Sequence, residues 1–254
     1  MAYLQFFWLV LLRCLRREGP GSIRLFYPRT VIHYHRLPWL LYREIFVNRC
    51  YDPPVPLPTH PRILSIGANI GLGALYFLNR YPDARLTSVE PNPEAFRLLE
   101  INLASARFPQ ASIRLDRRAV AAEDGEVEFV IPKKNKTAVF ASVNGIRTSG
   151  LEVDTLTVPC VALNRLISEK VDLLKLDIEG FEYEVLDQAE INAQKVSSLI
   201  IEFHDREKNG QKCAAILNRL VNEQGYRLSD AHGKSIDVRT FCQGPGAALA
   251  KLTA

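Results

Sequence analysis

The fold of this chain follows from the segment Ile63-Leu-Ser-Ile-Gly67-Ala-Asn-Ile-Gly71-Leu-Gly73. A run of apolar and β-branched residues ends abruptly in glycines, and a helix-like stretch follows. Glycine lets the backbone turn tightly and lets a ligand approach the main chain. The helix after the turn offers free N–H groups to an electron-rich ligand group. The pattern therefore predicts a strand, a ligand-binding turn and a helix.

A second strand pattern, Leu86-Thr-Ser-Val89, ends at Glu90 and is followed by Pro91-Asn-Pro93. The acid lies roughly 20 residues beyond the glycine turn, where a carboxylate can accept hydrogen bonds from two ribose hydroxyls. Strand, glycine turn, helix, strand and acid together predict a site for a nucleoside cofactor.

From Arg62 onward the chain alternates between strand and helix patterns. This alternation predicts an α/β fold with a largely parallel sheet, helices on both faces, and ligands at the carboxyl ends of the strands. Glu123-Asp-Gly125-Glu126 reads as the turn of a hairpin, and residues 133–150 read as a long polar loop. We expect strands at 62–66, 85–89, 171–176 and 198–203, and helices at 72–80, 93–106, 182–188 and 212–224.

Residues 1–60 are expected to form an N-terminal extension of helices and short strands, ahead of a main domain over residues 61–254. The prolines of Asp52-Pro-Pro-Val-Pro-Leu-Pro58 cannot continue a helix and mark the boundary. The helix predicted over residues 2–17 is apolar, but it is shorter than the ~20 residues that span a bilayer. Its apolar face favours packing on the domain or on a partner subunit, as in a homodimer, over peripheral attachment to a membrane surface.

Two further strands also end in polar residues. Asp177 and Glu179 directly follow a buried strand, and Glu202 and His204 lie two apart on the next strand, where they would share a face. We expect these four side chains to converge in one pocket. His204 or Asp177 could remove the proton of a substrate hydroxyl. Alternatively, Asp177, Glu202 and His204 could hold a divalent metal ion that polarises that hydroxyl.

Charge and cysteine content limit which partners and which cellular compartment we expect for this protein. The formal charge is +4, and the basic residues are too scattered to predict a nucleic-acid groove. The five cysteines form no Cys-x-x-Cys pair, which predicts reduced thiols in a cytoplasmic protein.

Several stretches, in the same order and at similar spacing, resemble the FkbM family of S-adenosylmethionine-dependent methyltransferases. The resemblance implies a Rossmann-like, seven-stranded sheet that binds S-adenosyl-L-methionine. It also implies O-methyl transfer to a hydroxyl of a sugar, a glycan or a secondary metabolite. The stretches that carry it are Ser65–Gly71, Val89–Pro93, Arg118–Ala121 with Asp124-Gly125, Asp172–Gly180 and Ile201–His204.

The same resemblance assigns roles to individual residues. It places Glu90 on the ribose hydroxyls with Asn92 nearby, and it places Ala119 at the border of the adenine. It turns Asp177 and Glu179 toward the transferring methyl group and the acceptor. The residues that it places along the methionine and ribose side of the cofactor are Gly67, Ala68, Asn69 and Gly71.

Ser65 is also expected to bind the cofactor, near its methionine end, but it departs from the family, which usually has an acid at this position. A serine can only hydrogen-bond there, so a non-catalytic binding subunit stays open as an alternative. A nicotinamide-dependent oxidoreductase is a further alternative, because it shares the strand, the turn and the ribose acid. Against it, the segment from Gly67 to Gly71 does not fit the G-x-G-x-x-G pattern of dinucleotide sites.

Overall fold

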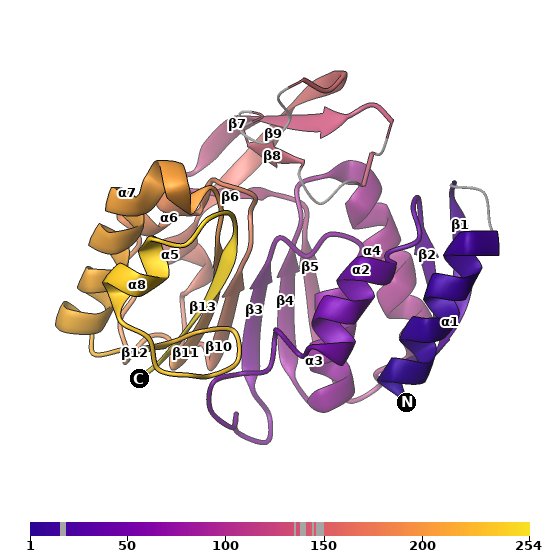
Figure 1. The fold of residues 1–254 in the computed structure, drawn as a ribbon, viewed down its shortest axis with the longest axis horizontal. Coiled ribbons are helices and arrows are strands. Elements are labelled where there is room, and N and C mark those ends of the chain that lie inside the picture. Colours follow the sequence, from indigo (N-terminus) through magenta and orange to yellow (C-terminus); the bar gives the residue numbers. More distant parts are fainter. Residues whose placement is uncertain (16–18, 135, 138–140, 144, 146–149) are drawn as a thin grey trace.

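The computed structural model covers residues 1–254 and describes all of them except 16–18, 135, 138–140, 144 and 146–149. Its main sheet has seven strands in the order β12-β13-β11-β10-β3-β4-β5 (Figure 1). All neighbouring pairs are parallel except the two that involve β13. The predicted Rossmann-like α/β fold is confirmed. The strands are β3 (Arg62–Ile66), β4 (Arg85–Val89), β5 (Ser112–Asp116), β10 (Leu173–Leu176), β11 (Ser198–Phe203), β12 (Arg227–Ser229) and β13 (Ala248–Thr253).

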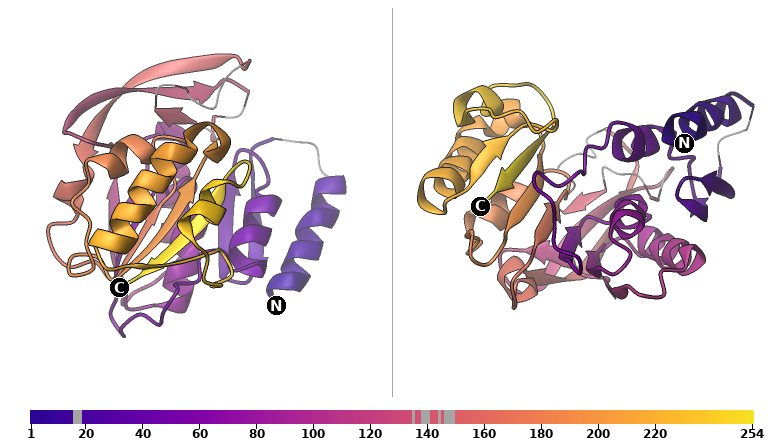
Figure 2. Two further views of the ribbon diagram at one scale, coloured as in Figure 1. Left: turned by 60° about the vertical axis from the view of Figure 1, so that its left-hand side comes forward. Right: turned by 90° about the horizontal axis from the view of Figure 1, so that it is seen from below.

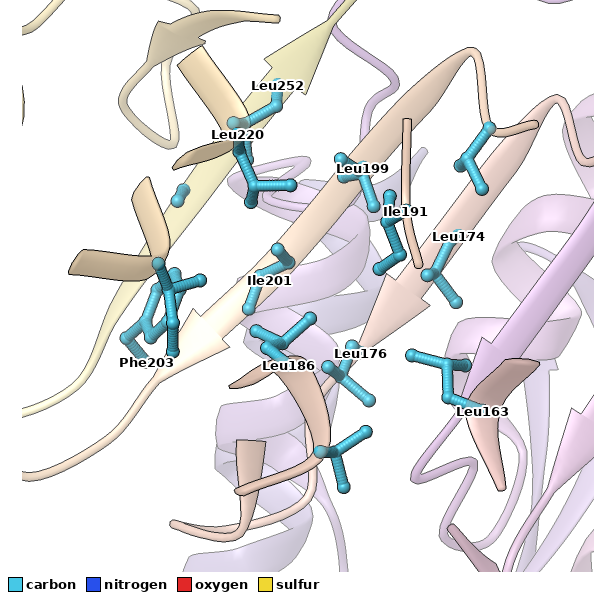
Figure 3. Packing of buried hydrophobic residues seen from close by; sticks show 14 of the residues in the cluster. Leu163, Leu174, Leu176, Leu186, Ile191, Leu199, Ile201, Phe203, Leu220 and Leu252 are labelled. Carbon is cyan, nitrogen blue, oxygen red and sulfur yellow. The ribbon is translucent and has the colours of Figure 1, made fainter. Parts of the chain in front are cut away.

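Alternating side chains of the buried strands feed two apolar cores, one on each face of the sheet. Leu174, Leu199 and Ile201 pack against helices α5 to α8 (Figure 3). Leu173 and Ile200 point the other way, to the core of α3, α4 and the N-terminal elements. The helices are α3 (Leu72–Arg80), α4 (Pro93–Ala106), α5 (Leu163–Leu166), α6 (Glu182–Asp187), α7 (Arg206–Asn218) with the π-helical η2 (Arg219–Glu223), and α8 (Val238–Cys242).

A second sheet, of four strands in the order β6-β9-β7-β8, lies above the carboxyl ends of β3 and β4 (Figure 1). The hairpin predicted at residues 123–126 is wrong. The turn is present, but β9 lies between the two strands, and Cys160 pairs with Ala119 on one side and Gly125 on the other. The loop predicted over 133–150 contains β8, and several of its residues lie outside the described ones. The strands are β6 (Ala119–Ala121), β7 (Gly125–Pro132), β8 (Ser142–Val143) and β9 (Val153–Ala162).

The N-terminal elements pack on the α3–α4 side of the sheet and share its apolar core. The side chain of Asn102 on α4 fastens them, because its Oδ1 accepts from the N–H of His33 (2.6 Å) and its Nδ2 donates to the carbonyl of the same residue (3.1 Å). The division at residue 60 stays a prediction. The elements are α1 (Ala2–Leu15), β1 (Gly21–Phe26), β2 (Arg29–Tyr34), α2 (Trp39–Tyr42) and the π-helical η1 (Arg43–Val47).

Helix α1 lies at the outer edge of the molecule in both views of Figure 2. Residues 16 and 17, which were predicted to close this helix, lie outside the described residues. Over the described part of the chain, every helix is too short or too polar to cross a bilayer.

Candidate cofactor and acceptor site

Backbone hydrogen bonds hold the glycine turn after β3, and the turn lies so close to neighbouring backbone that it leaves no space for a side chain. The N–H groups of Gly67 and Ala68 both donate to the carbonyl of Val89, at 3.0 Å. Gly67 has φ +74°, and a Cβ there would lie 1.7 Å from the carbonyl oxygen of Asp177. Gly71, with φ +94°, caps the start of α3. The turn is therefore pressed against the end of β10, and the backbone requires glycine at both positions.

Glu90, at the carboxyl end of β4, is buried and held by the main chain. Its Oε2 accepts from the N–H of Asn69 (2.8 Å) and its Oε1 from the N–H of Asn92 (2.9 Å). Burial raises the pKa of Glu90 to about 7, although these two hydrogen bonds act in the opposite direction. Each carboxylate oxygen keeps a lone pair for a further donor.

The turn and Glu90 open onto a cavity of about 830 Å³, a volume that includes the open solvent at its mouth. Ala119 is buried in its wall, and the second sheet adds the apolar side chains of Phe129 and Val143. Asn92 also lines it and caps α4, since its Oδ1 accepts from the N–H groups of Glu94 and Ala95. All the residues predicted to bind the cofactor line this cavity except Gly71, which shapes the turn beside it.

A second cavity adjoins the first, and the two share residues from the acid-rich corner after β10 and from the N-terminal elements. Three further carboxylates, those of Glu44, Glu202 and Asp230, line the second cavity alone. The acid-rich corner therefore lies between the two cavities. The shared residues are Leu41, Ile45, Tyr51, Asp177 and Glu179.

Asp177 is fixed through one oxygen. Its Oδ2 accepts from the hydroxyl of Tyr51 (3.0 Å) and pairs with the ammonium of buried Lys175 (3.1 Å). Lys175 also donates to the carbonyl of Gly67 (2.8 Å), which couples this ion pair to the turn. Burial raises the pKa of Asp177, but the charges of Lys175 and His204 outweigh it and lower the pKa below its ordinary value. Asp177 is therefore an ionised carboxylate.

His204 is buried among carboxylates. Its ring Nδ1 lies 3.2 Å from Oε1 of Glu182, a fully buried acid that also accepts from the backbone N–H of His204 (2.6 Å). Its Nε2 faces Glu179 (3.5 Å) and Asp177 (3.9 Å). Burial lowers the pKa of His204, but the hydrogen bond to Glu182 and the surrounding negative charge outweigh it and raise the pKa to about 9. The imidazole is consequently protonated at neutral pH.

Three side chains offer ligand atoms within 4.8 Å of one another, which is close enough for a divalent cation: Asp177, Glu179 and His204. Glu202, the other acid of the predicted metal site, has Oε1 3.7 Å from Nε2 of His204. Burial and the charge of Asp177 raise the pKa of Glu202 to about 8. A metal ion at this cluster stays a prediction.

Residues 65–228 match the profile of the methyltransferase FkbM domain. The chain belongs to the FkbM methyltransferase family. It is 31% identical over 173 residues to methyltransferase sdnD of Sordaria araneosa, covering 58% of this chain and 66% of that protein, just under two thirds of its length. It is 29% identical over 195 residues to 31-O-demethyl-FK506 methyltransferase FkbM of Streptomyces tacrolimicus, covering 65% and 74%.

Among solved structures, the FkbM methyltransferase of Methylobacillus flagellatus KT superimposes with a TM-score of 0.48 at 13% identity. The alignment covers 84% of this chain and 52% of that one.

In this FkbM-family chain, the structure brings Asp177, Glu179, Glu202 and His204 into one cluster. The three acids line the second cavity as predicted, whereas His204 is buried behind them and lines neither cavity. Ser65 lies at the floor of the cofactor cavity, buried, and its Oγ has no hydrogen-bond partner among the described residues. The catalytic and cofactor-binding roles of the individual residues stay predictions.

Sequence reasoning did not foresee two members of the site. Tyr51 lies in no recognised motif and is 126 residues before Asp177, to which its hydroxyl donates a hydrogen bond. Glu182 is the last acid of the Asp177-Ile-Glu-Gly-Phe-Glu182 segment, so the density of acids was visible. The role of Glu182 as the buried partner of His204 was not visible in the sequence, because it depends on packing between α6 and β11.

Proposed function

We propose that this chain is an S-adenosylmethionine-dependent methyltransferase that methylates a hydroxyl of a sugar, a glycan or a secondary metabolite. One observation supports the cofactor above the others. Buried Glu90 is held by two backbone N–H groups at the end of β4, facing a cavity whose glycine turn leaves no room for a side chain. A carboxylate fixed in this way can accept from both hydroxyls of a ribose.

S-Adenosylmethionine, when bound, supplies a methyl group on a positively charged sulfur, which an acceptor oxygen can attack. The residues present fit such a ligand. Glu90 would hold the ribose, and Ala119 with Phe129 would border the adenine as apolar walls. The turn from Gly67 to Asn69 would carry the methionine side along its main chain.

The acid-rich corner would position the acceptor. Oδ2 of Asp177 is engaged by Tyr51 and Lys175, whereas Oδ1 lies 3.9 Å from Nε2 of His204, beyond hydrogen-bond reach. Oδ1 is therefore the oxygen that would accept from an acceptor hydroxyl, orient it toward the methyl group, and receive its proton as the C–O bond forms. Protonated His204 would hold the surrounding carboxylates together rather than act as the base.

Two observations support a hydroxyl acceptor. Five carboxyl groups are among the side chains that line the second cavity, those of Glu44, Asp177, Glu179, Glu202 and Asp230, and carboxylates accept hydrogen bonds from hydroxyl groups. In addition, the name of the relative from Streptomyces tacrolimicus describes methylation at an oxygen.

Titration calorimetry with S-adenosylhomocysteine tests the cofactor site. The wild-type chain should bind, Glu90→Ala should bind at least about a hundredfold more weakly, and Glu94→Ala should bind like the wild type. Glu94 is a matched control, since its side chain is 41% exposed on neighbouring α4. Absence of binding by the wild type, or saturable binding of a nicotinamide dinucleotide in its place, would refute the proposal.

Turnover tests the acceptor class. S-Adenosylhomocysteine release should rise with hydroxylated sugars or polyketides and should stay at background with their O-methylated forms. Release that instead follows acceptors carrying an amine or a thiol, with no hydroxyl requirement, would overturn the O-methyl assignment while leaving the cofactor site intact.

A further inference from the structure

The outward face of α1 is apolar from Tyr3 to Leu11. Tyr3, Leu4, Phe7 and Leu11 are 65%, 70%, 67% and 55% exposed, and their spacing of three and four residues places them on one side of the helix. The opposite side is buried, as at Leu9. A surface helix of a globular protein normally turns charged or polar residues to solvent, but residues 1–12 contain no charged side chain.

Packing fixes this orientation, so the helix cannot turn its apolar row inward. The rings of Phe6 and Trp39 stack at 6.2 Å, and the ring of Trp8 lies 5.5 Å from that of Phe26. Seven of the nine exposed large apolar side chains in the described chain belong to residues 1–40, so exposed apolar surface is concentrated in the N-terminal elements. Helix α1 is the outermost element here, as both views of Figure 2 show.

Positive charge accompanies the apolar row. Residues 1–43 contain seven arginines and a single acidic residue, a formal charge of +6, whereas the whole chain carries +4. Arg24 and Arg29 line a cavity together with Met1, at the start of α1. In the described part of the chain, neither arginine forms an ion pair.

We propose that the N-terminal extension docks on an anionic membrane surface, with the apolar row of α1 inserted at the headgroup boundary and Arg24 and Arg29 on lipid phosphates. An apolar helix face next to cationic side chains is the composition that binds such surfaces. A second copy of the chain fits the row less well, because a symmetric contact would bring two segments of charge +6 together.

Co-sedimentation of the full chain with lipid vesicles tests the docking. The wild type should bind vesicles of phosphatidylcholine mixed with phosphatidylglycerol, bind pure phosphatidylcholine more weakly, and lose the difference at high salt. Leu4→Glu should weaken vesicle binding about tenfold or more, since it removes one inserted apolar side chain and adds a negative charge. Leu151→Glu, at another exposed leucine, is the matched control and should bind like the wild type.

Tryptophan fluorescence gives an independent reading, because Trp8 and Trp39 are the two tryptophans of the chain. In a Trp39→Phe background, emission from Trp8 should shift to shorter wavelength with anionic vesicles and should be quenched by brominated acyl chains. Absence of vesicle binding would overturn the proposal, and so would equal loss in Leu4→Glu and Leu151→Glu. A dimer in light scattering that Leu4→Glu dissociates would likewise overturn it, by assigning the row to a second copy.

Discussion

Replacing Glu90 by glutamine keeps the shape of the side chain while removing its charge, and so isolates what the carboxylate contributes. Each carboxylate oxygen accepts one hydrogen bond from a backbone N–H group, that of Asn69 at 2.8 Å or that of Asn92 at 2.9 Å. Glutamine offers one oxygen and one NH₂ group. One of the two backbone N–H groups would therefore keep its acceptor, and the other would face the NH₂ group, which is itself a donor. Of the two bonds to a ribose, one would be lost and the other would become neutral.

The size of the effect follows from the charge on those bonds. Hydrogen bonds to a charged group contribute about 1.5–3 kcal/mol each, so Glu90→Gln should cost cofactor binding about 2–4 kcal/mol. That corresponds to a rise of roughly 30- to 1,000-fold in the Kd of S-adenosylhomocysteine. Titration calorimetry at pH 8, where the carboxyl is ionised, measures it directly.

The pH dependence provides the sharper test. Burial raises the pKa of Glu90 to about 7 in the free protein, and hydroxyl donors favour the ionised form, so binding should lower that pKa. Protons then compete with the cofactor below pH 7, and affinity should fall about tenfold from pH 8 to pH 6. In Glu90→Gln this slope should vanish. A flat wild-type profile, a rise in affinity toward low pH, or a slope retained in the variant would refute the assignment.

Four further outcomes follow from the same geometry. Asp177→Asn should lower kcat at least about a hundredfold and change the Kd of S-adenosylhomocysteine far less. Ser65→Asp should leave that Kd unchanged or lower it, because Lys175 pairs with Ser65 in register and can compensate the new charge. Gly67→Ala should lower the free energy of unfolding in urea by about 2 kcal/mol or more. His204→Gln should destabilise the protein by about 2–3 kcal/mol below pH 6.5, and this deficit should disappear as pH rises through about 9, where wild-type His204 loses its proton.

Each of these outcomes has a result that contradicts it. Full activity of Asp177→Asn on the true acceptor would remove Asp177 from the chemistry. A clear loss of affinity in Ser65→Asp would show that position 65 lies elsewhere relative to the cofactor. Unchanged unfolding of Gly67→Ala would mean that the turn is not pressed against β10. A stability deficit of His204→Gln that grows with pH would mean that the buried imidazole is neutral.

Features that depend on residues close together in the chain could be predicted before the structure was known. The bounds of β3, α3, β4, α4 and β11 agree with those expected from apolar periodicity and from the glycine and proline positions. The turn at Gly67 and the acid at Glu90 could be predicted in the same way, since each directly follows the end of a strand that the local sequence indicates. The convergence of Asp177 and His204 also followed, because adjacent parallel strands end at one edge of a sheet.

Features that depend on residues far apart in the chain became visible in the folded protein alone. Strand β9 takes the place of β6 beside β7, because eight residue pairs between β7 and β9 outweigh a local turn signal. Tyr51 reaches Asp177 across 126 residues, and Glu182 fixes the ring of His204 from another element. The charge states of the site follow from these contacts. Burial and neighbouring charge set the pKa of a group, and the sequence reveals neither of them, because both depend on which groups the folded chain brings together.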